Sequence, residues 1–485
     1  MGKRLTTSDA SFLYMESASG PMHISSVVTI EGELTFEQVY EHLAERIHLL
    51  PSYRRKLAQV PFNIAHPSWV EDPDFDLANH VLHNPVPEGT SLEEAVEYAV
   101  QLNEAIMDRT KPLWLFRVIT GVPDATVILQ ATHHCMIDGA SGIELQAIVY
   151  DFDPAGDPVS EPASEWLPQD PPGPAALLSH ALNEKISELT QTNWGEVMRM
   201  PTQQNQHLLQ RAGRIMQDFL TKPVITAPFN AGVVGPQRRL AWLKVSFDQM
   251  REVRRAMGGT INDVVLTMVS EGVSRYLEHH GENVVDQYMR IMCPVNVRTE
   301  DQKGALGNQV SAIFPVLPAW PMAADKRLAA VCVETDKIKR NQDAQALTLM
   351  QETAVEPWPI ALWPTQMVGT SMDPTAVAAN FPMPPMPTGF RPPNIGYNFT
   401  CTNVPGAQVP QYLCGMPVKD QVGLLILTGN VGFSVTILSY NKQLYFGLIS
   451  EPRLLPDVER IAEGAQSTFD ALLAMAQERA ANFAS

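Results

Sequence analysis

The chain has 485 residues, of which 45% are hydrophobic, so it can fold into two or three domains and is not a disordered protein. Its 35 Lys and Arg against 53 Asp and Glu give a formal net charge of −18. Nucleic-acid phosphates would repel such a chain, and broad electrostatic docking on anionic lipid is disfavoured, although a local apolar patch can still contact a membrane. Five cysteines without a C-x-x-C spacing predict reduced thiols and no zinc site.

The first part of the chain, residues 1–153, alternates strand and helix patterns. No apolar core follows Lys3 and Arg4, so we expect no signal peptide. Thr35 and Gln38 form a capping-box pattern that opens an amphipathic helix. Strand patterns cover 22–30, 113–120 and 125–133, and a further helix is expected after residue 142.

Residues 154–222 connect the two halves. Prolines recur throughout 154–174 and exclude a central strand or helix, so this stretch is predicted to be a linker. Residues 175–222 contain few β-branched side chains and are predicted to be helices that cross to the second half.

The second half, residues 223–485, is also predicted to mix strands and helices. Strands are expected at 239–247, 288–296, 308–317, 395–402 and in the pair 424–439 and 443–449, and helices at 248–257, 261–280 and 456–480. The most apolar long stretch, Gly423 to Ser439, is rich in β-branched residues and predicts a buried hairpin instead of a membrane span. Asn441 and Lys442 are expected at a second turn. The chain is therefore predicted to form two α/β halves with a ligand site between them.

One proline-dense segment, residues 357–393, fits no regular element. Trp, Phe and Met side chains alternate with its prolines. Two interpretations remain open: an adaptable apolar surface for a greasy substrate or partner, or a loop packed over the core.

A group of polar residues follows the strand predicted at 125–133. His133 and His134 are followed by Asp138 and Gly139, and these four fixed positions should occur together by chance in about one chain per thousand. Neighbouring strand residues point to opposite faces, so the two histidines are poor ligands for one metal ion. Asp138 and Gly139 could simply cap the next helix, and Cys135 could be a nucleophile, although no feature of the sequence indicates a lowered thiol pKa.

The pattern His-His-x-x-x-Asp-Gly is the signature of the CoA-dependent acyltransferase superfamily, and the chain resembles its bacterial wax ester synthase/acyl-CoA:diacylglycerol acyltransferases. The resemblance extends over nearly the whole chain. Further matching residues are Asp9, Glu16, Met22, His23, Pro112, Leu113, Trp114, Asn262, Asp263, Pro294, Val295, Arg298, Gly307 and Asn308. One departure is Leu115, where a glutamate is common in the family.

The resemblance implies a fold of two chloramphenicol-acetyltransferase-like domains, each a mixed sheet with helices, and an active site at their interface. It implies an O-acyltransferase that moves a long-chain acyl group from acyl-CoA to diacylglycerol or a fatty alcohol. His134 would be the general base, for which an imidazole with a pKa near 6.5 is well suited. Asn262 would stabilise the oxyanion, although a helix-cap role is an equal alternative.

Other site residues are also implied by the resemblance. The catalytic group would comprise His133, His134, Asp138 and Asn262, with Asp138 pairing with Arg298 to hold its loop. Trp114, Gly139 and Asn308 would bind substrate, and Asp263 and Arg298 would be structural.

The expected partners follow from this activity. Acyl-CoA is a co-substrate, no cofactor or metal is expected, and the residues that contact CoA are not predicted. The protein is expected in the cytoplasm, peripherally associated with the inner membrane or lipid inclusions, with a homodimer as one option and without nucleic acid. Two alternatives are a superfamily enzyme with another acceptor and a non-catalytic lipid-inclusion binding protein.

Overall fold

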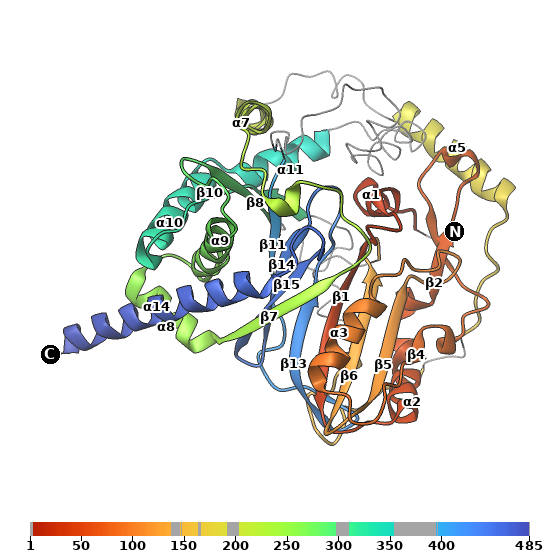
Figure 1. Cartoon of the computed structure of the whole chain (residues 1–485). Helices are drawn as coiled ribbons and strands as arrows, with labels where there is room; N and C mark the ends of the chain where they lie inside the picture. Colours follow the sequence, from red (N-terminus) through yellow and green to blue (C-terminus); the bar gives the residue numbers. More distant parts are fainter. Residues whose placement is uncertain are drawn as a thin grey trace.

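The described chain contains two large sheets, each packed with helices, that lie side by side (Figure 1), and one small sheet of two strands. The computed structural model describes residues 3–136, 146, 148–162, 166–191, 203–296, 310–353, 394 and 396–484. Within these ranges no helix is both long and apolar enough to cross a membrane. The prediction of two α/β units is confirmed.

The first sheet has six strands in the order β12-β13-β1-β6-β5-β4. All neighbours are antiparallel except β4 and β5. The strands are β1 (His23–Glu31), β4 (Val81–His83), β5 (Trp114–Val122), β6 (Ala125–His133), β12 (Tyr412–Leu413) and β13 (Met416–Leu424). Every residue of β6 is buried, because helices cover both faces of the sheet.

The two faces of this sheet pack against different helices. On one face Ile128 packs with Leu43 of α2 (Phe36–Arg46), and on the other Val127 packs with Ala99 of α3 (Leu92–Leu102). The capping box predicted at the start of α2 is present. Other elements in the first part of the chain are α1 (Thr7–Met15), β2 (Arg55–Ala58), β3 (Ser68–Glu71), α5 (Pro174–Gln191) and α7 (Gln203–Thr221).

The second sheet has the order β10-β8-β11-β14-β15-β7, with β9 also paired to β8. Its strands are β7 (Arg239–Ser246), β8 (Tyr288–Asn296), β9 (Val310–Ile313), β10 (Val316–Pro318), β11 (Phe399–Val404), β14 (Phe433–Tyr440) and β15 (Gln443–Ser450). Asn441 and Lys442 adopt φ angles of 43° and 59° between β14 and β15. This left-handed backbone is that of a tight hairpin turn, so the hairpin predicted here is confirmed.

Helices of the second unit pack closely against one another. They are α8 (Phe247–Met257), α9 (Ile261–His279), α10 (Ala324–Arg340), α11 (Asp343–Thr353) and α14 (Glu459–Ala484). At the crossing of α9 and α14, a Cβ atom on Gly272 would lie 2.5 Å from the Ile461 carbonyl oxygen. Glycine is therefore required for these two helices to approach as they do.

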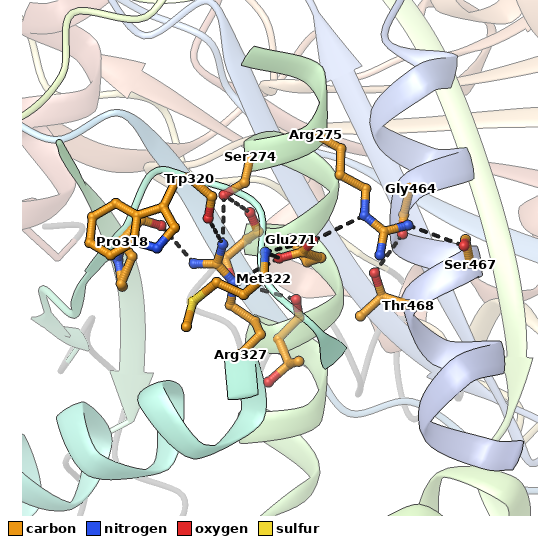
Figure 2. Close-up of polar contacts among 12 residues, drawn as sticks. Glu271, Ser274, Arg275, Pro318, Trp320, Met322, Arg327, Gly464, Ser467 and Thr468 are labelled. Carbon is orange, nitrogen blue, oxygen red and sulfur yellow. Dashed lines mark hydrogen bonds and ion pairs between the residues drawn. The ribbon is translucent and has the colours of Figure 1, made fainter. Parts of the chain in front are cut away.

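A buried ion pair connects α9, α10 and the segment after β10 (Figure 2). Glu271 accepts hydrogen bonds from Arg327 Nε at 2.9 Å, from Arg275 Nε at 3.0 Å and from the Met322 backbone N–H at 3.1 Å. Arg327 also donates to the Pro318 and Trp320 carbonyl oxygens. Donors surround the Glu271 carboxylate, which compensates for its loss of water.

Two predictions about strands require correction. The predicted hairpin within Gly423 to Ser439 is wrong, because β13 belongs to the first sheet and β14 to the second. A strand pattern shows that a segment is extended and buried, but it does not identify the partner strand. The first sheet thus contains strands from both halves of the chain. The single strand expected at 308–317 is two strands in its described part, β9 and β10. The proline-dense segment, residues 357–393, lies outside the described residues.

The two sheets meet where glycines allow close contact. A Cβ on Gly423 of β13 would lie 2.6 Å from the Thr436 side chain of β14. A Cβ on Gly447 of β15 would lie 2.2 Å from the Gly423 carbonyl oxygen. Any side chain at Gly447 would therefore push the sheets apart.

Candidate active site

The two motif histidines lie at the end of β6, between β1 and β5. The His133 backbone N–H donates to the Leu113 carbonyl oxygen at 2.9 Å. The His134 backbone N–H donates to the Met22 carbonyl oxygen at 2.8 Å. Both histidines are thus fixed to rigid neighbouring segments, as precise positioning of reactive side chains requires.

The His133 ring is fully buried and its tautomer is defined by its neighbours. The Cys135 backbone N–H donates to Nδ1 of His133 at 3.1 Å. Because Nδ1 accepts this hydrogen bond, the ring proton lies on Nε2. Nε2 is 3.4 Å from Glu16 Oε1, a close contact without the alignment of a regular hydrogen bond.

The Glu16 carboxylate is buried among donors. Oε1 accepts from the Met22 backbone N–H at 3.1 Å, and Oε2 accepts from Arg109 Nε at 3.1 Å and Nη2 at 2.9 Å. Burial alone would raise the pKa of Glu16, but the contacts with His133, Met22 and Arg109 outweigh it and lower the pKa to about 2. Glu16 therefore stays ionised at neutral pH.

His134 is half-buried, with its Nδ1 enclosed, and its ring stacks on an aromatic ring of α1. Its ring centroid is 3.9 Å from that of Phe12, with 12° between the planes. Burial of the ring lowers the pKa of His134 to about 4, and the neighbouring His133 contributes to this shift. The pKa of His134 in the folded protein is therefore lower than the value near 6.5 expected from the sequence. The imidazole is neutral at pH 7, which is the form that accepts a proton.

Trp114 of the Pro-Leu-Trp motif lies inside the first unit. Its indole N–H donates to the Tyr53 carbonyl oxygen at 2.8 Å, and its ring stacks on His80 at 4.6 Å. Trp114 is the cross-strand partner of Thr132 and lines a small cavity with Tyr53 and Thr132. Trp114 thus packs beside the strand that carries the histidines, and its role in substrate binding stays a prediction.

Asn262 and Asp263 occupy the first turn of α9 but differ in surroundings. Asp263 is buried, and its carboxylate accepts hydrogen bonds from the Thr260 hydroxyl at 2.7 Å and the Thr335 hydroxyl at 2.8 Å. Thr260 caps the helix, so the cap role considered for Asn262 is filled by another residue. Asn262 is exposed, and its Oδ1 accepts from Asn403 Nδ2 at 2.7 Å. No hydrogen bond among the described residues links Asn262 to either histidine.

Four predicted site residues cannot be placed. Asp138, Gly139, Arg298 and Asn308 lie outside the described residues. Their roles stay predictions, including the Asp138–Arg298 pair.

The Cys135 thiol is buried next to the histidines. Burial raises the pKa of Cys135 well above the ordinary value, and the carboxylates of Asp9 and Glu16 act in the same direction. A protonated, enclosed thiol is a poor nucleophile, so the structure argues against the nucleophile interpretation.

Sequence analysis missed two residues that contact this site. Phe12 stacks on His134, and Arg109 neutralises Glu16 while its Nη2 donates to the Leu13 carbonyl oxygen at 2.6 Å. Neither carries a sequence signal of its own, because each contact depends on α1 folding back against segments distant in the sequence. Glu16 is identified in the sequence only as a match to the family pattern.

Solved structures of other proteins share the fold of this chain. The solved wax ester synthase/diacylglycerol acyltransferase of Marinobacter aquaeolei superposes with a TM-score of 0.64 at 19% identity, covering 98% of this chain and 100% of that one. The starter condensation domain of rhizomide synthetase, solved with C8-CoA and Leu-SNAC, gives a TM-score of 0.56 at 14% identity, with coverage of 98% and 94%. These two likenesses show the fold.

Sequence relatives identify the family. A Mycobacterium tuberculosis protein named as a probable diacylglycerol O-acyltransferase is 27% identical over 492 residues, covering 98% of this chain and 96% of the relative. Residues 5–265 match the family model of the wax ester synthase/diacylglycerol acyltransferase catalytic domain, and residues 306–473 match that of the WS/DGAT C-terminal domain. The chain therefore belongs to the wax ester synthase/diacylglycerol acyltransferase family and is an acyltransferase.

Proposed function

We propose that the protein transfers a long-chain acyl group from acyl-CoA to the hydroxyl of diacylglycerol or a fatty alcohol, with His134 as the general base. Family membership supports the substrate classes. The observation that carries the role of His134 is its half-buried, neutral imidazole, which follows the end of β6 and stacks on Phe12.

The chemistry requires one proton to move twice. An alcohol does not ionise near neutral pH, so its oxygen attacks the thioester carbonyl only as a base removes the hydroxyl proton. His134 accepts this proton as the C–O bond forms. It then returns the proton to the CoA sulfur as the C–S bond breaks, which leaves the ester, free CoA and a neutral imidazole.

Asn262 is the proposed donor to the oxyanion formed during the attack. Its Oδ1 is occupied by Asn403, which leaves the two N–H groups of its amide as donors. A fixed amide donor stabilises the negative charge that develops on the carbonyl oxygen.

The transfer is proposed to be direct, with acyl-CoA as co-substrate and without a cofactor. A covalent intermediate would require an activated nucleophile near His134. The buried thiol of Cys135 does not have that character, because burial raises its pKa.

Product analysis tests this function. Purified protein is given palmitoyl-CoA with dioleoylglycerol and hexadecanol in competition, and lipid products and free CoA are quantified. We expect triacylglycerol, wax ester or both, with one CoA released per ester formed, and a loss of about 10²- to 10⁴-fold in His134→Ala. CoA release without either ester would contradict the proposed acceptors, and unchanged turnover in folded His134→Ala would contradict the proposed base.

We also propose that the protein contacts membranes or lipid inclusions peripherally. Phe62, Leu182 and Ile186 are exposed by 78%, 44% and 58% on neighbouring elements, since α5 packs against the short helix at Pro61–Asn63. Apolar side chains at such a surface can enter the lipid interface.

Vesicle sedimentation tests this contact. Binding to phosphatidylcholine vesicles that contain diacylglycerol should weaken in a Phe62→Ser, Ile186→Ser double variant with unchanged melting temperature. Protein that leaves cell membranes only with detergent, and never with salt or carbonate, would contradict a peripheral attachment.

A further inference from the structure

We propose that Glu16 is a positioning residue that holds both motif histidines in the geometry required for acyl transfer. The inference rests on the proposed role of His134 as base. It assigns to Glu16 a function that acts through His133 and Met22, without contact with the substrate.

One carboxylate oxygen of Glu16 is connected to both histidines, to His133 directly and to His134 through Met22. Oε1 of Glu16 lies 3.4 Å from His133 Nε2, the ring nitrogen that carries the proton. The same oxygen accepts the Met22 backbone N–H at 3.1 Å, and the Met22 carbonyl oxygen accepts the His134 backbone N–H at 2.8 Å. Displacement of Glu16 therefore moves the His133 ring and the His134 backbone together.

The second oxygen connects Glu16 to the ring that stacks on His134. Oε2 accepts two hydrogen bonds from Arg109, whose Nη2 also donates to the Leu13 carbonyl oxygen at 2.6 Å. Leu13 follows Phe12 in α1, and Phe12 forms the 3.9 Å stack on His134. Glu16 thus also fixes the helix that defines the plane of the catalytic ring.

These contacts explain why the residue must be a carboxylate. Every described partner of Glu16, namely Met22, His133 and Arg109, presents an N–H group. Glutamine has the same shape but replaces one acceptor oxygen by an NH₂ group. That group would face donors in either orientation and leave them without an acceptor.

Glu271 provides a matched control for stability. Its carboxylate is equally enclosed and accepts from two arginines and from a backbone N–H (Figure 2). Glu271 lies on α9 in the second unit, and none of its described partners is a motif histidine. Glu271→Gln should therefore reproduce the cost of a buried glutamine without disturbing the histidines.

The experiment compares Glu16→Gln, Glu271→Gln and the unmodified protein. Melting temperature, kcat and KM for palmitoyl-CoA are measured with hexadecanol, and the ring ¹⁵N resonances of labelled histidines are recorded without substrate. Both variants should melt earlier. Only Glu16→Gln should lower kcat, on the order of 10- to 100-fold with KM little changed, because misplacing a catalytic group slows chemistry more than binding. Only Glu16→Gln should shift the His133 ring resonances, which a His133→Gln spectrum assigns.

Several outcomes would overturn the proposal. One is unchanged His133 resonances in folded Glu16→Gln; another is an equal loss of kcat in both variants. If Glu16→Gln does not fold, Glu16→Asp keeps the charge but withdraws the carboxylate by one methylene group. Its kcat should fall at least tenfold, and a native kcat would refute the positioning role. A lack of ester formation by the unmodified protein would contradict the proposed function alone, since the resonances still report on Glu16 and His133.

Discussion

The rate of this enzyme should begin to fall in acid at a much lower pH than is expected for a catalytic histidine with an ordinary pKa. With the pKa of His134 at about 4, nearly all of the imidazole is neutral at pH 5.5, whereas a histidine with a pKa of 6.5 would be about nine-tenths protonated. At pH 5.5 kcat/KM should therefore stay near its plateau value, whereas an ordinary histidine base would retain only about a tenth of its own plateau. The acidic limb should reach half of its plateau near pH 4.

The same pKa makes a prediction about stability, with a defined sign. In the unfolded chain His134 accepts a proton near pH 6.5, but in the folded protein it does so only near pH 4. Protonation therefore favours unfolding as the pH falls from 6.5 to 4, and the stability lost is about 3 kcal/mol. A His134→Gln variant lacks this loss, so its stability relative to the unmodified protein should improve by about that amount in acid.

The assay must separate these two effects. Initial rates are measured from pH 4 to 8 by chromatographic quantification of ester, and a parallel sample is held at each pH and then assayed at pH 7. Urea unfolding of both proteins at pH 7 and pH 4.5 gives the stability difference. A reversible loss of kcat/KM centred near pH 6.5 would refute the argument, because it would show that the ring is not desolvated or is not the base.

Four further substitutions test other predictions. Asn262→Ala should lower kcat by about 10²-fold with little change in KM for acyl-CoA, and native turnover in the folded variant would remove it from the site. If Asp138 and Arg298 form the buried pair that the resemblance implies, Asp138→Ala and Arg298→Ala should each lose about 3 to 5 kcal/mol of folding stability in denaturant titrations, because each leaves the other charge unpaired. Native melting of Asp138→Ala without activity would instead place Asp138 in the chemistry. Gly447→Ala should be destabilised by about 1 to 3 kcal/mol or more, because its Cβ would lie 2.2 Å from the Gly423 carbonyl oxygen, and an unchanged urea midpoint would contradict that contact.

Local features of the fold could be predicted from the sequence because local physics determines them. The strand expected at 288–296 is β8, and the turn at Asn441 and Lys442 is where a tight hairpin favours left-handed backbone. The partners of β13 could not be predicted, because alternation of apolar residues reports burial and not the neighbouring strand.

The candidate site divides in the same way. The two histidines could be located from a motif of seven consecutive positions, because all of these positions follow one another at the end of a single strand. The contact between Glu16 and His133 joins residues that are distant in sequence, and the stack of Phe12 on His134 depends on where α1 packs. The pKa of His134 follows from that packing, so no sequence pattern could supply it.

The place of β13 in the first sheet has a consequence for biosynthesis. One edge of β1 pairs with β13, which leaves the ribosome only after almost all of the preceding chain. Until then the nascent first unit exposes the unpaired edge of β1, the strand next to β6. Exposed strand edges pair with other chains and cause aggregation. Folding of this unit therefore finishes late, after β13 has left the ribosome, and a chaperone could cover the edge until then. A truncated N-terminal fragment is expected to form inclusion bodies, and co-expression of the missing C-terminal segment should return it to solution.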